Sequence, residues 1–221
     1  MQALAIWSLP VIFAITLHEA AHGYVARHFG DLTAYAAGRI TLNPLKHIDP
    51  VGTLLVPGLI LAVSSMGGNP MLFGWAKPVP VDFSRLRHPK RDMLWVAAAG
   101  PASNLVMALA WAIMFKLVIG ADEHSLSVAM VSMAAAGVSI NLVLMVLNLL
   151  PLPPLDGGRI AVSLLPRQLA YRFAQIEPYG FPILLLLLFT GVLSAILLPL
   201  LNLAQLLVET LVQISIFSPS V

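Results

Sequence analysis

The sequence predicts an all-α polytopic membrane protein with about four to six transmembrane helices, a re-entrant segment and a small membrane-associated β-hairpin. Hydrophobic residues make up 59% of its 221 residues and charged residues only 10%, whereas about 25% of an average soluble domain is charged. The mean hydropathy is +0.90. No polar stretch is long enough for a second folded domain, so we expect a single membrane-embedded domain over 1–221, with its core at 1–175 and C-terminal helices at 180–217.

Three segments in the first third of the chain predict three different structures. Residues 3–28 are mostly apolar and long enough to cross a hydrocarbon core of about 30 Å as a helix. Residues 39–43 alternate polar and apolar side chains and end at a proline, which predicts a strand or a short hairpin. Residues 53–66 are apolar but short, and Pro57 and Gly58 interrupt them. This segment is therefore expected to dip into the membrane and return.

The rest of the chain contains further apolar stretches. Those at about 93–118, 126–150 and 181–201 predict full membrane spans. The tail at 202–217 carries polar side chains at helical spacing on one face. It is either a last span with that face turned toward protein or an interfacial helix. The polar residues of the tail are Asn202, Gln205, Glu209 and Gln213.

The positions of the basic residues predict the orientation of the chain. If 53–66 dips and returns, eleven of the twelve Lys and Arg residues lie on one side of the membrane, and only Lys116 lies on the other. An excess of this kind is typical of the cytoplasmic side, so we expect the N-terminus outside and both basic connectors inside. No basic residue precedes the first apolar run, which argues against a cleaved signal peptide. The eleven residues are Arg27, Arg39, Lys46, Lys77, Arg85, Arg87, Lys90, Arg91, Arg159, Arg167 and Arg172.

The sequence His-Glu-Ala-Ala-His at 18–22 is the strongest chemical signal in the chain. On a helix His18 and His22 lie about 40° apart around the axis and about 6 Å apart along it. Both imidazoles can therefore bind one zinc ion, and Glu19 lies beside them, able to take a proton from a zinc-bound water. Ionisable side chains beside an apolar span are costly and usually mark function. The alternative is a helix end whose histidines only contact lipid headgroups.

Two residues compete for the position of the third ligand. Asp156 follows the third full span, and the predicted topology brings it to the depth of the histidine pair. Prolines before it unwind the chain, and glycines after it permit a close approach to the metal. His28 is the rival, ten residues after His18 as in the metzincin signature, but Val25 occupies the place where that signature needs a glycine. Asp156 can alternatively be a helix-end carboxylate that pairs with Arg159.

The ligand set bears on the kind of function. The chain has no cysteine, so a zinc ion must be bound by His, Asp or Glu. Two histidines and one carboxylate leave a tetrahedral position open for water, which is the catalytic pattern. Intramembrane His and Asp are also typical of a metal transporter, which has no need of Glu19, and a non-catalytic scaffold would tolerate the loss of the ligands. The other histidines lie in polar loops, where we expect them to be solvated: His47, His88 and His124.

Three motifs occur in order along about 1–175. They are His18-Glu19-Ala-Ala-His22, Gly100-Pro-Ala-Ser-Asn104, and Asn148 followed by Pro-Leu-Pro-Pro-Leu-Asp156-Gly. Together they resemble the site-2 protease family of intramembrane zinc metalloproteases. The chain is similar to a short bacterial form of this family that lacks a periplasmic PDZ insertion between its second and third spans, since only the turn 119–125 lies there.

The resemblance implies a role for most residues of these motifs. It implies that His18, His22 and Asp156 bind Zn²⁺ and that Glu19 is the general base. It also implies that Asn148 helps to hold the backbone of the substrate. The third motif therefore supplies both a metal ligand and a substrate contact.

The resemblance also implies how substrate is recognised and where. The strand region would match a membrane-associated β-hairpin that presents substrate, and Asn104 would be a packing or orienting residue. The expected substrate is a transmembrane protein, cleaved within or near its membrane segment in regulated intramembrane proteolysis. We expect the lipid bilayer as surroundings, no nucleic-acid partner, and a bacterial inner-membrane location with the active site toward the cytoplasm. The strand residues are Arg39, Ile40, Thr41 and Leu42.

Overall fold

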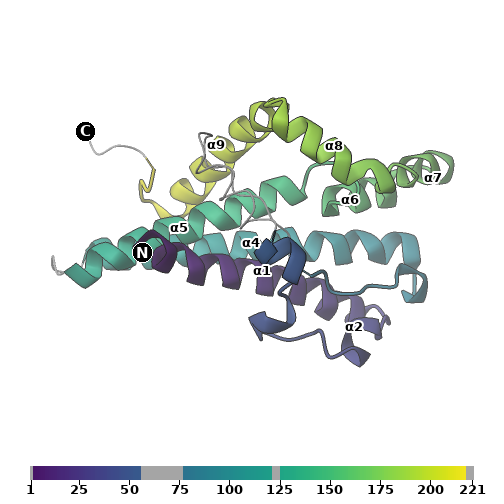
Figure 1. Cartoon of the computed structure of the whole chain (residues 1–221), viewed down its shortest axis with the longest axis horizontal. Helices are drawn as coiled ribbons and strands as arrows, with labels where there is room; N and C mark the ends of the chain where they lie inside the picture. Colours follow the sequence, from purple (N-terminus) through teal and green to yellow (C-terminus); the bar gives the residue numbers. More distant parts are fainter. Residues whose placement is uncertain (1, 56–76, 121–124, 218–221) are drawn as a thin grey trace.

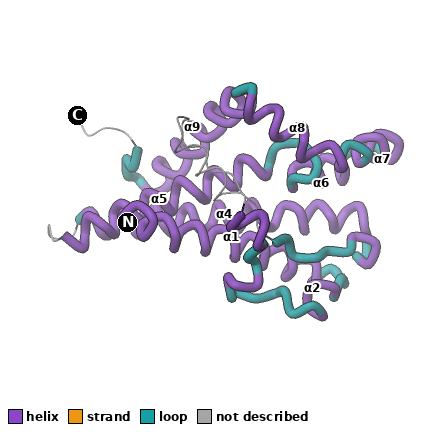
Figure 2. The backbone as a smooth tube through the Cα atoms, viewed as in Figure 1, coloured by secondary structure: helices purple, strands orange, loops and turns teal. Residues whose placement is uncertain are grey.

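The structure, a computed structural model, describes residues 2–55, 77–120 and 125–217. Within these ranges every regular element is helical and no strand is formed (Figures 1 and 2). In chain order the elements are α1 (Gln2–His28), α2 (Thr33–Ala36), η1 (Pro44–Lys46), η2 (Pro50–Leu55), η3 (Phe83–Arg85), α4 (Pro89–Ile119), α5 (Ser125–Asn148), α6 (Asp156–Leu164), α7 (Arg167–Ala174), α8 (Glu177–Phe189) and α9 (Val192–Val212).

Helices α1, α4 and α5 pack against one another at the centre of the molecule, with α4 antiparallel to the other two (Figure 1). Small residues at the interfaces let the helix backbones approach closely, which is how membrane helices associate. A Cβ on Gly137 of α5 would overlap the ring of Trp111 of α4. The fully buried alanines of the three helices include Ala14, Ala26, Ala108, Ala112 and Ala134.

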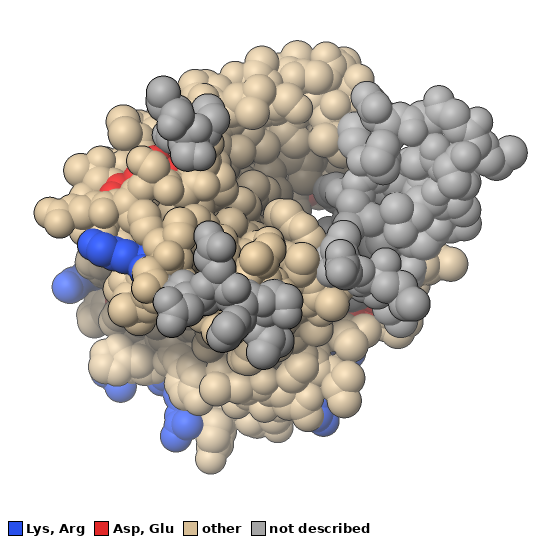
Figure 3. All heavy atoms as spheres, turned by 90° about the vertical axis from the view of Figure 1, so that its left-hand side faces the viewer, with Lys and Arg blue, Asp and Glu red and all other residues tan. Residues whose placement is uncertain are grey.

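Hydrogen bonds tie the ends of the helices together. The backbone N–H of Arg87 donates to the Phe29 carbonyl over 3.0 Å, which joins the chain before α4 to the end of α1. The Lys116 ammonium donates to the Val212 carbonyl over 2.7 Å, which joins the end of α4 to the end of α9. Lys116 and Arg27 therefore lie at opposite ends of the bundle. Figure 3 looks at the end that carries both termini, where most of the described surface belongs to residues other than Lys, Arg, Asp and Glu.

Three of the described helices are long and apolar enough to cross a membrane: α4, residues Val128–Asn148 of α5, and α9. The number rises to four if α7 and α8, which meet at a bend of 63°, form one broken span. The predicted spans at 93–118 and 126–150 are thus confirmed as long apolar helices. The first predicted span is the continuous 27-residue helix α1.

The C-terminal prediction is wrong in one respect. The apolar stretch 181–201 does not form one helix, because α8 ends at Phe189 and α9 begins at Val192. Gly191 between them has a φ of +76°, a left-handed conformation that glycine adopts without steric cost. Of the tail predicted at 202–217, only residues 202–212 are helical and form the second half of α9, so Asn202, Gln205 and Glu209 lie on a helix of spanning length, whereas Gln213 follows its last residue. The predicted re-entrant stretch 53–66 lies outside the described residues from 56 onward.

The predicted strand at 39–43 is also not formed, and these residues run as a loop (Figure 2). Local side-chain bonds satisfy its backbone in place of a partner strand. The Thr41 hydroxyl accepts from the Asn43 N–H over 3.1 Å, and the Asn43 side chain accepts from the Leu45 N–H at the start of η1. The Thr41 carbonyl faces His47 Nε2 at 3.0 Å. Period-two alternation over five residues was therefore not sufficient for a strand.

Candidate active site

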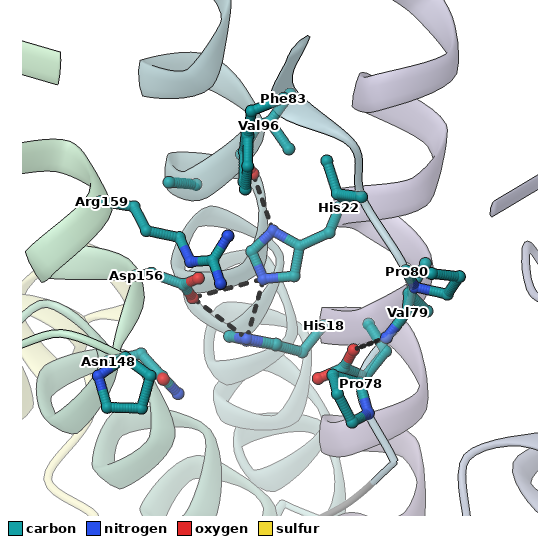
Figure 4. Close-up of a pocket in the computed structure, with 14 residues that line it drawn as sticks. His18, His22, Pro78, Val79, Pro80, Phe83, Val96, Asn148, Asp156 and Arg159 are labelled. Carbon is teal, nitrogen blue, oxygen red and sulfur yellow. Dashed lines mark hydrogen bonds and ion pairs between the residues drawn. The ribbon is translucent and has the colours of Figure 1, made fainter. Parts of the chain in front are cut away.

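Helices α1 and α6 bring His18, His22 and Asp156 together (Figure 4). The two imidazole Nε2 atoms are 3.1 Å apart, and Asp156 Oδ2 lies 3.2 Å from the first and 3.3 Å from the second. The three side chains are only 9–12% exposed. This is the arrangement expected for side chains that share one metal ion, and it joins positions 134 residues apart in the sequence.

The hydrogen bond made by Nδ1 of each imidazole, the ring nitrogen that faces away from the cluster, determines which nitrogen carries the proton. His18 Nδ1 lies 2.6 Å from Asn104 Oδ1, and His22 Nδ1 lies 2.7 Å from the Val96 carbonyl oxygen, both on α4. Both oxygens are acceptors, so each Nδ1 donates a proton. Each neutral ring then carries a lone pair on Nε2, the atom that faces the other ligands.

These lone pairs leave Asp156 in an unusual position. Its Oδ2 is buried without a hydrogen-bond donor among the described residues, and it faces two nitrogens that carry no proton in these tautomers. A cation between the three atoms would satisfy all of them. The donor set therefore fits Zn²⁺.

Gly100 makes room for the two histidines. A Cβ at this position of α4 would lie 2.5 Å from His18 Cε1 and 2.6 Å from His18 Nε2, and closer still to His22 Nε2. Real side chains do not approach so closely, so only glycine lets α4 pass directly beneath the ligands. This close packing explains why the motif Gly100-Pro-Ala-Ser-Asn104 begins with a glycine.

Tight turns hold Asp156 at the start of α6. A Cβ on Gly157 would overlap the carbonyl oxygens of Leu149 and Leu150, and one on Gly158 would overlap the backbone of Pro153. These close backbone approaches let the non-helical stretch 149–155 fold back on α6 and direct Asp156 toward α1. The predicted unwound segment before Asp156 is therefore present.

A cavity of about 340 Å³ lies beside the three ligand side chains (Figure 4). We call its side formed by α1, α4 and α6 the helical wall, and residues 78–83, which run along the other side, the loop wall. Glu19 lines the cavity, and its Oε2 accepts a hydrogen bond from the Val79 N–H over 2.7 Å. Asn148 lines the cavity as well, and its Nδ2 donates to the Leu144 carbonyl over 2.9 Å. The three candidate metal ligands, the Glu19 carboxylate and the Asn148 amide thus line one cavity.

The structure does not gather every residue that the sequence indicates. His28, the rival ligand, is exposed against the ring of Phe29 and does not belong to the cluster. The four residues of the predicted strand do not line the cavity. Arg39 contacts the loop wall and not the cavity itself: its Nη2 donates to the Lys77 and Pro78 carbonyls over 2.9 and 3.3 Å.

Predictions for the other charged groups had mixed outcomes. His47 is 2% exposed, so the expectation that it is solvated is wrong, because its ring packs under the loop and bonds Thr41. The His88 side chain is 73% exposed, as predicted, and His124 lies outside the described residues. Arg159 pairs with Glu177 at 3.4 Å, whereas the ion-pair partners of Asp156 among the described residues are His18 and His22, which argues against the alternative of a pair between Arg159 and Asp156.

Several residues at the site were missed at the sequence level. The Val96 carbonyl and the Val79 N–H are backbone groups, which no side-chain pattern reveals. Arg159 lines the cavity with its guanidinium 4.8 Å from the Phe83 ring. Asn141, whose buried amide bonds Asn104, could have been identified from the sequence. A polar residue in the middle of an apolar span is energetically costly and usually marks function.

Comparisons with known proteins agree with this geometry. The model of the family described as peptidase family M50 matches residues 114–191, which include Asn148 and Asp156. The chain is 40% identical over 202 residues to "Putative zinc metalloprotease YwhC" of Bacillus subtilis, covering 88% of this chain and 84% of the relative. It is 32% identical to "Putative zinc metalloprotease Rip2" of Mycolicibacterium smegmatis and of Mycobacterium tuberculosis, covering 66% and 52% of those proteins. No solved structure matches the chain.

Proposed function

Because this chain belongs to peptidase family M50 and is an integral-membrane zinc metalloprotease of the site-2 protease type, with Zn²⁺ as its cofactor, we propose that it hydrolyses a peptide bond within or near the transmembrane segment of a membrane-protein substrate. In this proposal His18, His22 and Asp156 bind the zinc ion. The single observation that carries it is the set of three lone-pair atoms beside a cavity that Glu19 also lines.

The residues divide the chemistry among them. Zinc bound at this site would supply Lewis acidity, which makes water nucleophilic near pH 7. Glu19 takes a proton from the attacking water and passes it to the leaving amine, as a general base and then a general acid. Its Oε2 is held by Val79, which leaves Oε1 for this transfer among the described contacts. Asn148 binds the substrate backbone, since its Oδ1 and the second proton of its Nδ2 are available beside the cavity.

A transmembrane substrate must unwind before it can react, because the peptide bonds of a helix are already paired. The cavity favours a substrate segment in an extended conformation, because residues 78–81, which line it, are themselves non-helical and could lie alongside such a segment. Pro78 and Pro80 have no N–H, so this segment offers mainly its carbonyl groups to a neighbouring backbone. Direct contacts of substrate with Ile40, Thr41 or Leu42 remain a prediction, whereas Arg39 acts through the loop wall.

The proposed location follows from the charges. The site lies toward the end of the bundle where α1 ends and α4 begins, the end that carries Arg27, Arg85 and Arg87 (Figure 1). Basic residues concentrate on the cytoplasmic side of membrane proteins. We propose a bacterial inner-membrane protein with its N-terminus outside and a cytoplasm-facing site that acts in regulated intramembrane proteolysis.

The experiment that tests the site is the zinc content of the detergent-purified protein. We expect about one zinc per molecule in the wild type and a loss in Asp156→Ala, because a third ligand is required for a stable catalytic site. His28→Ala is the matched control and should retain zinc. Zinc retained in Asp156→Ala and lost in His28→Ala would refute the ligand assignment.

The same preparations test the activity in vesicles against a library of single-span reporter proteins. The wild type should cleave at least one reporter at its membrane segment, and that reporter then serves as the standard substrate. Glu19→Gln should retain zinc and lose about 10²- to 10⁴-fold in rate, the usual contribution of a general base. Cleavage by Glu19→Gln at the wild-type rate would refute the mechanism.

A further inference from the structure

Asn141 is a buried amide that the proposed chemistry does not use. It lies in the apolar middle of α5, is fully buried and does not line the cavity. An amide in such surroundings costs several kcal/mol unless its hydrogen bonds are satisfied. Its partners therefore show what it does.

The partners form a chain of hydrogen bonds that ends at a metal ligand. The Asn141 Nδ2 donates to the Gly137 carbonyl over 2.8 Å, and its Oδ1 accepts from Asn104 Nδ2 over 3.0 Å. Asn104 Oδ1 in turn lies 2.6 Å from His18 Nδ1. Asn104 Nδ2 also faces the Ala14 carbonyl at 3.3 Å.

The direction of this chain is fixed by its first member. A backbone carbonyl can only accept, so the NH₂ group of Asn141 must face Gly137 and its oxygen must face Asn104. Asn104 then has to present its NH₂ group to Asn141 and its oxygen to His18. The Nδ1 of His18 can only donate to that oxygen, which leaves the lone pair of Nε2 directed at the metal position.

We propose that Asn141 is a positioning residue of the metal site: through Asn104 it holds His18 in the tautomer whose Nε2 lone pair faces the metal. The inference rests on the proposed role of His18 as a zinc ligand. Without Asn141, the longer bond to Ala14 is the one contact among the described residues that still orients the NH₂ group of Asn104. A flipped amide would offer an N–H to His18 Nδ1 and favour the tautomer with a proton on Nε2, which cannot bind a metal there.

Zinc affinity, measured on the full chain in detergent by competition with a chelating dye, tests the proposal. Asn141→Leu removes the orienting oxygen and should bind zinc about 10- to 100-fold more weakly, the usual effect of losing a partner behind a metal ligand. Asn141→Asp in its neutral form can still donate to Gly137 and accept from Asn104, so its affinity should stay within about threefold of the wild type.

Two further variants separate this role from packing. Asn141→Ser can bond back to the Gly137 carbonyl but is too short to reach Asn104, so it should fold and still lose affinity. Leu142→Ala, at the neighbouring fully buried position, should destabilise the bundle and leave zinc affinity unchanged. Equal affinities of Asn141→Asp and Asn141→Leu, or a loss in Leu142→Ala as large as in Asn141→Ser, would overturn the proposal.

A spectroscopic readout addresses the tautomer directly. In zinc-free protein the ¹⁵N chemical shifts of His18 should report a proton on Nδ1 in the wild type and a shift toward Nε2–H in Asn141→Leu. An unchanged tautomer in Asn141→Leu would contradict the inference. Failure of the proposed zinc site is distinguishable, because it would appear as a wild type that binds no zinc at all.

Discussion

The two walls of the cavity are held in different ways. On the helical wall, the proposed zinc ligands His18, His22 and Asp156 are nearly buried, and each is in contact with at least one of the others. On the loop wall, Pro78 and Pro80 are exposed. Hydrogen bonds such as the one from Val79 to Glu19 attach this wall to the bundle, and at its far end Val81 and Phe83 pack against the buried apolar cluster between α1 and α4.

This difference separates metal binding from substrate handling. A site for a metal needs ligands fixed within a fraction of an ångström, which close-packed helices provide. An extended segment with exposed side chains, such as those of Pro78 and Pro80, opens at a lower free energy than close-packed helices. We therefore expect changes that displace His18, His22 or Asp156 in the helical wall to alter zinc affinity, and changes in the loop wall to alter turnover while zinc stays bound.

The largest effect should come from Gly100→Ala in the helical wall. The added methyl group would lie 2.6 Å from His18 Nε2, so at least one ligand ring must move away from the metal position. We expect at least a 100-fold loss of zinc affinity, since even the loss of a partner behind a ligand costs about 10- to 100-fold. Chelator competition measures it.

Gly120→Ala provides the matched control for this substitution. It follows the last residue of the same helix at its other end, where a Cβ would have no neighbour closer than 4.0 Å among the described residues. This variant should bind zinc like the wild type. If Gly100→Ala folds and its zinc affinity stays within threefold of the wild type, the helical wall is not as rigid as the comparison requires.

The same contrast explains which features the sequence could predict. The helices that carry the site follow from long apolar runs, and the relation of His18 to His22 follows from the helix repeat alone. Asp156 was accessible through topology, because two spans in the same direction bring their ends to one level. These are properties of regular elements, in which sequence spacing determines distance.

The remaining features depend on contacts that no local pattern encodes. The bond between Glu19 and Val79 joins a side chain to a backbone N–H 60 positions away. Residues 39–43 have the strand alternation, but side-chain bonds from Thr41 and Asn43 satisfy the backbone instead. The break at Gly191 depends on a left-handed conformation within an apolar run, where composition predicts one continuous span.

A smaller effect is expected from Val79→Pro in the loop wall, which removes the N–H that bonds Glu19. Residues that precede a proline already favour the extended conformation, and the substitution retains it. Hydrogen bonds to charged groups contribute about 1.5–3 kcal/mol, so loss of this one should lower kcat about tenfold or more on the standard reporter. Val79→Ala, which keeps the N–H, should remain within about twofold. A fall in zinc content in Val79→Pro would contradict the separation of the two walls.

The smallest effect should come from Arg39→Ala, which releases the far end of the loop wall. The guanidinium bonds the Lys77 and Pro78 carbonyls at the surface, where water competes for the same groups, so these bonds should contribute less than the part-buried bond from Val79 to Glu19. We expect a fall in kcat/KM of about threefold with zinc affinity unchanged, measured on the standard reporter and by chelator competition. Arg91→Ala removes an exposed basic side chain at the same end of the bundle and controls for the loss of charge. A loss in Arg39→Ala as large as in Val79→Pro would mean that Arg39 contacts substrate itself, because its bonds to the loop wall are too weak to account for it.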